Sequence, residues 1–168
     1  GLRDYCLWVG AREGAIVDKV SGVGALLAAP RVRAAFPLQT APYLDAMSGV
    51  KQDWRQGRIA TASGFALDAV GMDQALRGAL RLNSRPGLLV LDDVQSSSDS
   101  EYIVGRKIDQ ITRSILPAGA ENCGTVFVMN RISDTSIMAG TLEGKLDFLR
   151  RRVVSGPWPQ VRGIEIEL

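Results

Sequence analysis

The stretch Pro86-Gly87-Leu88-Leu89-Val90-Leu91-Asp92-Asp93 consists of a turn, four consecutive aliphatic residues and two carboxylates. A short apolar run that follows a turn signal is typical of a strand buried on both faces, as in the centre of a parallel sheet. The two acidic residues end the run, so we expect them at the carboxyl edge of the sheet, where open α/β folds bind ligands. The stretch therefore predicts an α/β fold with Asp92 and Asp93 at a ligand-binding edge.

Apolar patterns upstream of this strand predict a second strand, a helix and a hairpin. Residues 5–9 form a short β-prone run that Gly10 closes. Residues 11–28 carry an apolar face at helical spacing, made of Ile16, Val20, Val23 and Leu27. We expect Pro30 to end this helix and residues 37–42 to be irregular. Residues 58–62 and 65–70, separated by Ser63-Gly64, indicate two strands joined by a tight turn.

Downstream patterns predict a crossover to a further strand. Ser98-x-x-Glu101 has the form of a capping box, and the helix behind it would run to Pro117. Residues 125–129 follow as a strand, and the crossover would place Asn130 on the same sheet edge as Asp92. We expect a short helix over 135–144 and terminal strands at 148–154 and 161–166. Cys6 falls in a predicted buried strand and Cys123 in a polar loop, which favours neither a disulfide framework nor a CxxC metal site.

A strand of aliphatic residues ending in two acids also has the form of the Walker B motif of NTPases. In that motif the first acid holds Mg²⁺ and the second orients the attacking water. A strand-terminal Asp is equally a common helix cap or turn former, so Asp92 and Asp93 each have a structural alternative.

The order of the motifs resembles the ATPase domain of the large terminase subunit of tailed phages and prophages. The matching features are Leu76-Arg77-Gly78, then Arg85-Pro86 with the acidic strand, then the serine-rich segment 96–100, and finally residues 125–131 with Asp134. The resemblance covers nearly the whole chain. It implies one domain over residues 1–168, a three-layer αβα sandwich of the P-loop NTPase (ASCE) type that is incomplete at its N-terminus.

The resemblance also implies a role for individual residues. Asp92 would organise Mg²⁺ and Asp93 would take the place of the water-positioning acid, where the family often has Glu. Asn130 occupies the position of the coupling residue that senses the γ-phosphate of ATP, although a strand-end cap is an alternative. Arg77 matches an arginine that could act as a finger on a neighbouring subunit's nucleotide, or lie on a solvated helical face.

One element of the family is missing, because no G-x-x-x-x-G-K-[ST] motif occurs in the chain. In a terminase this P-loop should lie just before Tyr5, so we expect the chain to be a piece of a larger motor and to be inactive alone. The intact protein would use ATP and Mg²⁺ to drive double-stranded DNA into a procapsid. Its partners would be the portal protein, the small terminase subunit and copies of itself in a ring, in the bacterial cytoplasm.

Composition narrows the chemistry further. The chain has no histidine, which excludes catalytic triads, Cys-His pairs and HExxH zinc sites. No stretch approaches the length of a membrane span, so we expect a soluble protein without a membrane partner. Sixteen of the twenty basic residues are arginine, a side chain suited to phosphate contact, although a GC-rich genome has the same effect. Arg150-Arg151-Arg152 could touch DNA phosphates or protect a sheet edge.

Two other functions are compatible with the sequence. The chain could be a Mg²⁺-dependent nuclease that uses Asp92, Asp93 and a third acid such as Asp134, since two-metal sites need several converging carboxylates. It could also be a non-catalytic module that kept the fold in order to bind partners.

Overall fold

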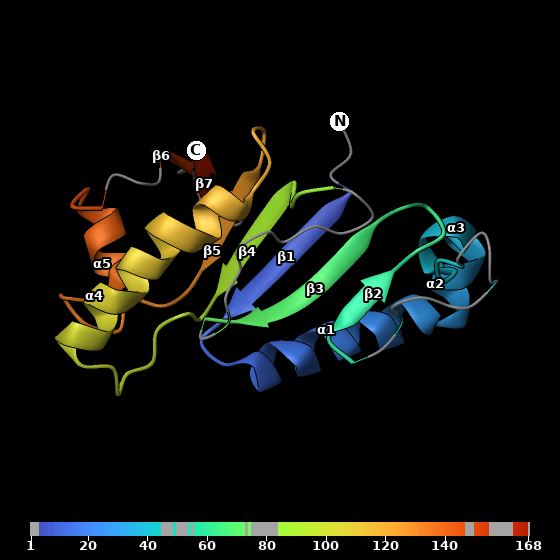
Figure 1. Ribbon diagram of the computed structural model, residues 1–168, viewed down its shortest axis with the longest axis horizontal. Coiled ribbons are helices and arrows are strands. Elements are labelled where there is room, and N and C mark those ends of the chain that lie inside the picture. Colours follow the sequence, from blue (N-terminus) through green and yellow to red (C-terminus); the bar gives the residue numbers. More distant parts are fainter. Residues whose placement is uncertain are drawn as a thin grey trace.

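The computed structural model describes residues 4–44, 49, 54, 56–72, 74, 84–146, 150–154 and 163–167, the last two ranges as backbone paths. Figure 1 shows the arrangement of its helices and strands. In chain order they are β1 (Tyr5–Gly10), α1 (Glu13–Ala28), α2 (Pro30–Ala35), α3 (Pro37–Thr40), β2 (Arg58–Ala60), β3 (Ala66–Gly71), β4 (Leu88–Asp92), α4 (Glu101–Gln110), η1 (Ile111–Ile115), η2 (Leu116–Ala118), β5 (Gly124–Val128), α5 (Ile137–Leu142), β6 (Arg150–Val154) and β7 (Gly163–Glu167).

Five strands form one mostly parallel sheet in the order β2-β3-β1-β4-β5. The strands β3, β1, β4 and β5 are parallel, and β2 runs antiparallel to β3. The turn between β2 and β3 contains Gly64 at a φ of 86°, a backbone conformation that suits glycine. The predicted α/β class, parallel sheet and hairpin are therefore confirmed. Strands β6 and β7 form a separate antiparallel pair.

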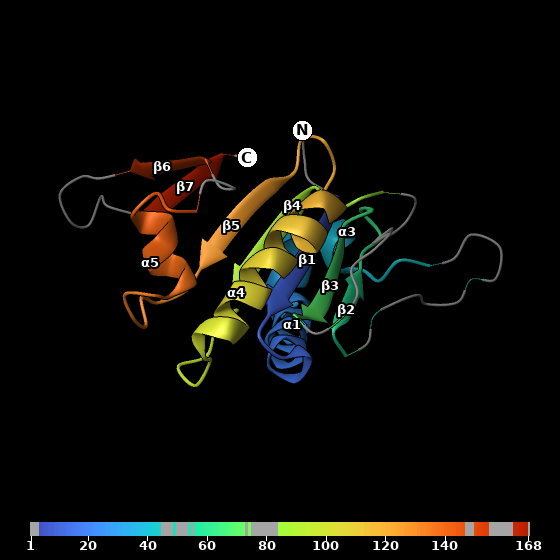
Figure 2. The same cartoon turned by 60° about the vertical axis from the view of Figure 1, so that its left-hand side comes forward.

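Helices cover both faces of the sheet because its central strands present apolar side chains on both sides. On β1, Tyr5, Leu7 and Val9 pack in a core with residues of α4 and η1, including Val104 and Ile111. The alternate residues Cys6 and Trp8 belong to a second cluster with Ile16 and Val20 of α1. Figure 2 shows α4 and α1 on opposite sides of the sheet. This arrangement is consistent with the expected three-layer sandwich.

The two faces of β4 are not buried equally, which corrects the prediction of a strand buried on both. Leu89 and Leu91 are fully buried under α4, whereas Leu88 and Val90 on the other face are partly exposed. On β5, Val126 and Val128 are 44% and 50% exposed. The reason is the position of α1, which lies mainly against β1, β2 and β3.

α1 ends at Ala28, before Pro30, as predicted, whereas the starts of three other helices differ from the prediction. Pro30 and Pro37 each begin a short helix, α2 and α3, because proline is well suited to the first helical turn. Ser98 does not cap α4. Its N-cap is Ser100, whose Oγ accepts a hydrogen bond from the backbone N–H of Ile103. After Gln110 the helix widens into a π-helical turn, η1, before Pro117 lies in the closing 3₁₀ turn.

The two cysteines both lie in the interior. Cys123 lies in the loop before β5, as predicted, but is buried there, and Cys6 is buried on β1. Neither cysteine forms a disulfide. Burial, with the Cys123 thiol nearby, raises the pKa of Cys6 to about 12. The Cys6 side chain is therefore not a reactive thiolate near neutral pH.

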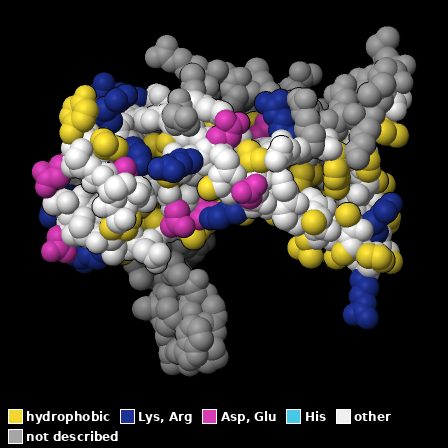
Figure 3. All heavy atoms as spheres, turned by 90° about the horizontal axis from the view of Figure 1, so that it is seen from below, with side chains coloured by type: hydrophobic (Ala, Val, Ile, Leu, Met, Phe, Trp, Pro, Cys, Tyr) yellow, Lys and Arg dark blue, Asp and Glu magenta, His cyan; other side chains and the backbone are white. Residues whose placement is uncertain are grey.

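Hydrophobic side chains also gather on the surface, at the end of the molecule formed by α2 and α3 (Figure 3). This patch includes Leu26, Phe36 and Leu38, each more than half exposed. In the part of the chain that the structure describes, no helix has the length and apolar character needed to cross a bilayer.

Candidate functional site

Four parallel strands end in register at one edge of the sheet. Gly10 of β1 pairs with Gly71 of β3 on one side and with Asp92 of β4 on the other, and Asp92 pairs with Val128 of β5. Asp92 is the one residue in this row with an ionisable side chain. A Cβ added to Gly10 would lie 2.2 Å from the side chain of Ile16, so glycine lets α1 begin close to this edge. The predicted position of Asp92 is confirmed.

The carboxylate of Asp92 is buried and held by two donors on neighbouring elements. Its Oδ2 accepts a hydrogen bond of 3.0 Å from Nε1 of Trp8 on β1. The same oxygen lies 2.6 Å from Nζ of Lys19 on α1. Only 8% of the Asp92 side chain is exposed, against 43% of the Lys19 side chain. A buried carboxylate is stable only when it is paired and hydrogen-bonded, and these two contacts meet that requirement.

Asp93 differs from its neighbour in both exposure and backbone. Its side chain is exposed, and its φ of 47° makes it the only described non-glycine residue with a positive φ. Its backbone N–H donates to the carbonyl of Val128 at 2.9 Å, which continues the contact between β4 and β5 past the strand end. Asp adopts the left-handed region more readily than most residues, so the chain turns sharply here and leaves the Asp93 carboxylate on the surface.

Asn130 is exposed and follows the last residue of β5 by two positions. Since β4 and β5 are parallel, Asn130 lies at the same edge of the sheet as Asp92. Arg77, the predicted arginine finger, lies outside the described residues. Arg150, Arg151 and Arg152 lie on β6, where the backbone register sets Arg150 opposite Glu167 and Arg152 opposite Glu165.

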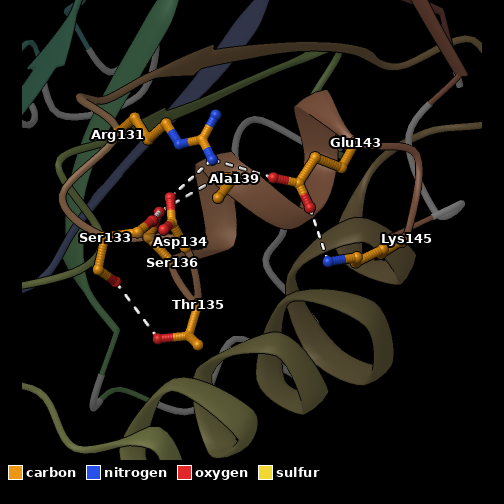
Figure 4. Close-up of polar contacts among 8 residues, drawn as sticks. All are labelled: Arg131, Ser133, Asp134, Thr135, Ser136, Ala139, Glu143 and Lys145. Carbon is orange, nitrogen blue, oxygen red and sulfur yellow. Dashed lines mark hydrogen bonds and ion pairs between the residues drawn. The ribbon is translucent and has the colours of Figure 1, made fainter.

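The segment after Asn130 is held by an ion-pair network on the surface (Figure 4). Nη2 of Arg131 lies 2.8 Å from Oδ1 of Asp134 and 3.0 Å from Oε1 of Glu143. Nζ of Lys145 lies 2.6 Å from the other oxygen of Glu143. The hydrogen bond and charge of Lys145, with a smaller contribution from Arg131, lower the pKa of Glu143. Asp134 thus pairs with Arg131 in this network.

Sequence analysis missed three residues that define the site: Lys19, Trp8 and Gln95. Gln95 is buried, and its Oε1 accepts a hydrogen bond from the backbone N–H of Ile137. Lys19 and Asp92 are 73 residues apart in the chain, and Trp8 and Asp92 are 84 apart. The one signal in the sequence is the aliphatic Val94 directly after the two acids, which indicates that the chain stays near the core there; Val94 and Gln95 are both buried.

Oxygen ligands suit Mg²⁺, which proteins commonly bind through one or two carboxylates together with water and phosphate oxygens. Asp92 and Asp93 provide such carboxylates, and both described contacts of Asp92 fall on Oδ2 rather than Oδ1. Asp92 is therefore a residue that could hold a Mg²⁺ ion, with Asp93 next to it in the chain. Within the described residues, no three acidic or cysteine side chains gather as a metal site of their own.

Comparisons with protein-family models, with curated proteins and with solved structures found no match to this chain.

Proposed function

We propose that this chain is part of the ATPase motor domain of a phage or prophage terminase large subunit, which drives double-stranded DNA into procapsids. The observation that carries the proposal is the position of Asp92, a buried carboxylate at the carboxyl end of β4. Ligands of open α/β sheets bind at that edge. The order of the motifs along the chain supports the same function, and a P-loop NTPase type of fold is part of the proposal.

In this function the residues of the edge have separate roles. Asp92 would hold Mg²⁺, which would neutralise charge on the phosphates of ATP, and Asp93 would position the attacking water. Trp8 orients the carboxylate of Asp92 through its indole N–H. Asn130 offers an amide that can both donate and accept a hydrogen bond at the same edge. The chain contains no glycine-rich lysine motif for the phosphates, so the proposal assigns that role to other parts of the motor.

The nuclease alternative depends on Asp134 as a third carboxylate. Asp134 is 92% exposed and pairs with Arg131, and the described residues contain no group of three acids around a common point. The motor proposal needs Asp92 but not Asp134, whereas the nuclease needs both.

These two acids therefore provide the test, in the complete protein from which the motor would be built. Asp92→Asn should lower ATP turnover on the order of 10³-fold, since a metal ligand supports several kcal/mol of charge stabilisation. Asp134→Asn, the matched control at the same edge, should leave turnover within about twofold, because surface ion pairs contribute little. Near-normal turnover in Asp92→Asn would overturn the proposal. Metal-dependent DNA cleavage that both variants abolish would favour the nuclease, and a protein without either activity would favour a binding module.

A further inference from the structure

The ion pair between Lys19 and Asp92 is asymmetric. The carboxylate is fixed at the end of a central strand and almost completely buried, while nearly half of the lysine side chain is exposed. Lys19 therefore reaches from the surface of α1 onto a buried charge. Lysine has a long and flexible stem, so its ammonium can move into water without any change in the helix.

The second donor to Asp92 does not share this freedom. Trp8 is partly buried on β1, in the cluster that packs against α1, and its indole N–H is neutral. If Lys19 moved away, Trp8 would still fix the orientation of the carboxylate. The charge of Asp92 would then need a new partner, because a buried carboxylate without a counter-charge is costly.

A second lysine pair in the same molecule shows the contrast. Nζ of Lys107 lies 2.6 Å from Oδ2 of Asp99, the same distance as in the first pair. Both of these side chains are largely buried, and Asp99 also accepts a hydrogen bond from the backbone N–H of Ser96. Asp99 lies in the loop between β4 and α4, and Lys107 lies on α4, so this pair holds the loop against the helix. It serves as a structural reference.

We propose that Lys19 is the resident counter-ion of Asp92, and that a divalent metal ion binds Asp92 by displacing it. The two cations cannot share the carboxylate without repelling each other, and a divalent ion has the larger charge. Lys19 thereby sets the metal affinity of the edge. Its freed ammonium stays on α1 beside the edge, where it can contact a phosphate group. The inference rests on the proposed role of Asp92 as a metal ligand.

The test uses Mn²⁺ alone as the probe, titrated into the full chain and followed by the electron paramagnetic resonance signal of the free ion. Lys19→Met should tighten Mn²⁺ binding about fivefold, the amount that corresponds to a partly exposed ion pair. Lys107→Met, the matched control, should not change it. Asp92→Asn should abolish the binding in either background.

A second measurement needs no substitution near the site. The acetylation rate of each lysine, measured by mass spectrometry on the unmodified chain, should rise for Lys19 when Mn²⁺ is added. Lys107 and Lys145, which pair with Asp99 and Glu143, should keep their rates.

The outcomes separate the inference from the function on which it rests. Mn²⁺ binding that depends on Asp92 but is unchanged or weaker in Lys19→Met, with no change in Lys19 acetylation, would overturn the role of Lys19 and leave the metal site standing. Absence of any Mn²⁺ binding that depends on Asp92 would overturn both.

Discussion

The side chain of Gln95, in the loop after β4, accepts a hydrogen bond of 2.8 Å from the backbone N–H of Ile137 at the start of α5. Gln95 follows Asp93 by two residues and is buried. Ile137 is the first residue of α5, and its N–H would have no partner within that helix. The bond therefore joins the acidic loop after β4 to the helix after β5.

Replacing Gln95 should lower stability through this bond. We expect Gln95→Ala to lower the free energy of unfolding by about 1–3 kcal/mol, because it leaves a buried N–H unpaired. Gln95→Glu should lose less, since it keeps an acceptor and places a negative charge at a helix N-terminus. Urea denaturation measures both. Ser136→Ala, which removes the other cap of α5, is the reference at about 0.5–2 kcal/mol. A Gln95→Ala protein as stable as the unmodified one would show that the bond contributes nothing.

The backbone of Asp93 predicts a distinct pattern of substitutions. Its positive φ should make Asp93→Gly neutral or slightly stabilising, whereas Asp93→Val should cost about 1–3 kcal/mol, since a β-branched residue is strained there. Asp93→Asn keeps the backbone preference and removes only the charge. In the complete protein we therefore expect Asp93→Asn to fold normally and to lose ATP turnover. Thermal melting compares the folds, and equal melting temperatures for Gly and Val would contradict the backbone argument.

Asp99 should make stability depend on acidic pH. Burial alone would raise the pKa of this carboxyl, but the hydrogen bonds from Lys107 and Ser96 and the charge of Lys107 outweigh it and lower the pKa below its ordinary value of 3.8. A lowered pKa in the folded state stabilises the protein above the ordinary pKa, and this contribution disappears as the pH falls through the folded value. Asp99→Asn should therefore be less stable than the unmodified protein near neutral pH, and the difference should shrink below about pH 4. A urea midpoint difference that stays constant down to about pH 2 would exclude this linkage.

Arg77 remains a prediction from the sequence, and mixing experiments can test it. If Arg77 completes a neighbouring subunit's site, Arg77→Ala in the complete protein should lower turnover by about 10³–10⁵-fold and leave ATP binding to one subunit unchanged. Mixing it with the inactive Asp92→Ala protein should restore part of the activity, because some interfaces then contain both groups. Co-assembly without any recovery would place Arg77 on an ordinary solvated surface.

The sequence predicted the sheet because its strands are specified locally. The aliphatic run before Asp92 and the alternation in the hairpin predict strands without any knowledge of the neighbouring strands. The spacing of Ile16 and Val20 predicts the buried face of α1. The edge position of Asp92 followed from the parallel order alone. These features depend on residues a few positions apart.

The contacts that make the site depend on residues far apart in the chain. Nothing in the sequence around Lys19 predicts that it pairs with Asp92. Nothing around Gln95 predicts its hydrogen bond to Ile137. Helix starts were wrong for a different reason. Proline can end one helix and begin the next, so Pro30 correctly marked the end of α1 but did not reveal the start of α2. Three serines close to Ser100 compete for the cap of α4.

The exposed valines of β5 bear on how the protein behaves at high concentration. Residues 124–128 form the last strand of the sheet, carry no charge and leave Val126 and Val128 in contact with solvent. Short, uncharged and β-prone segments at a sheet boundary are where chains associate into aggregates. A single lysine in place of Val126 would act as a gatekeeper there without touching the buried face of the strand, which makes this strand the first place to modify if the protein precipitates.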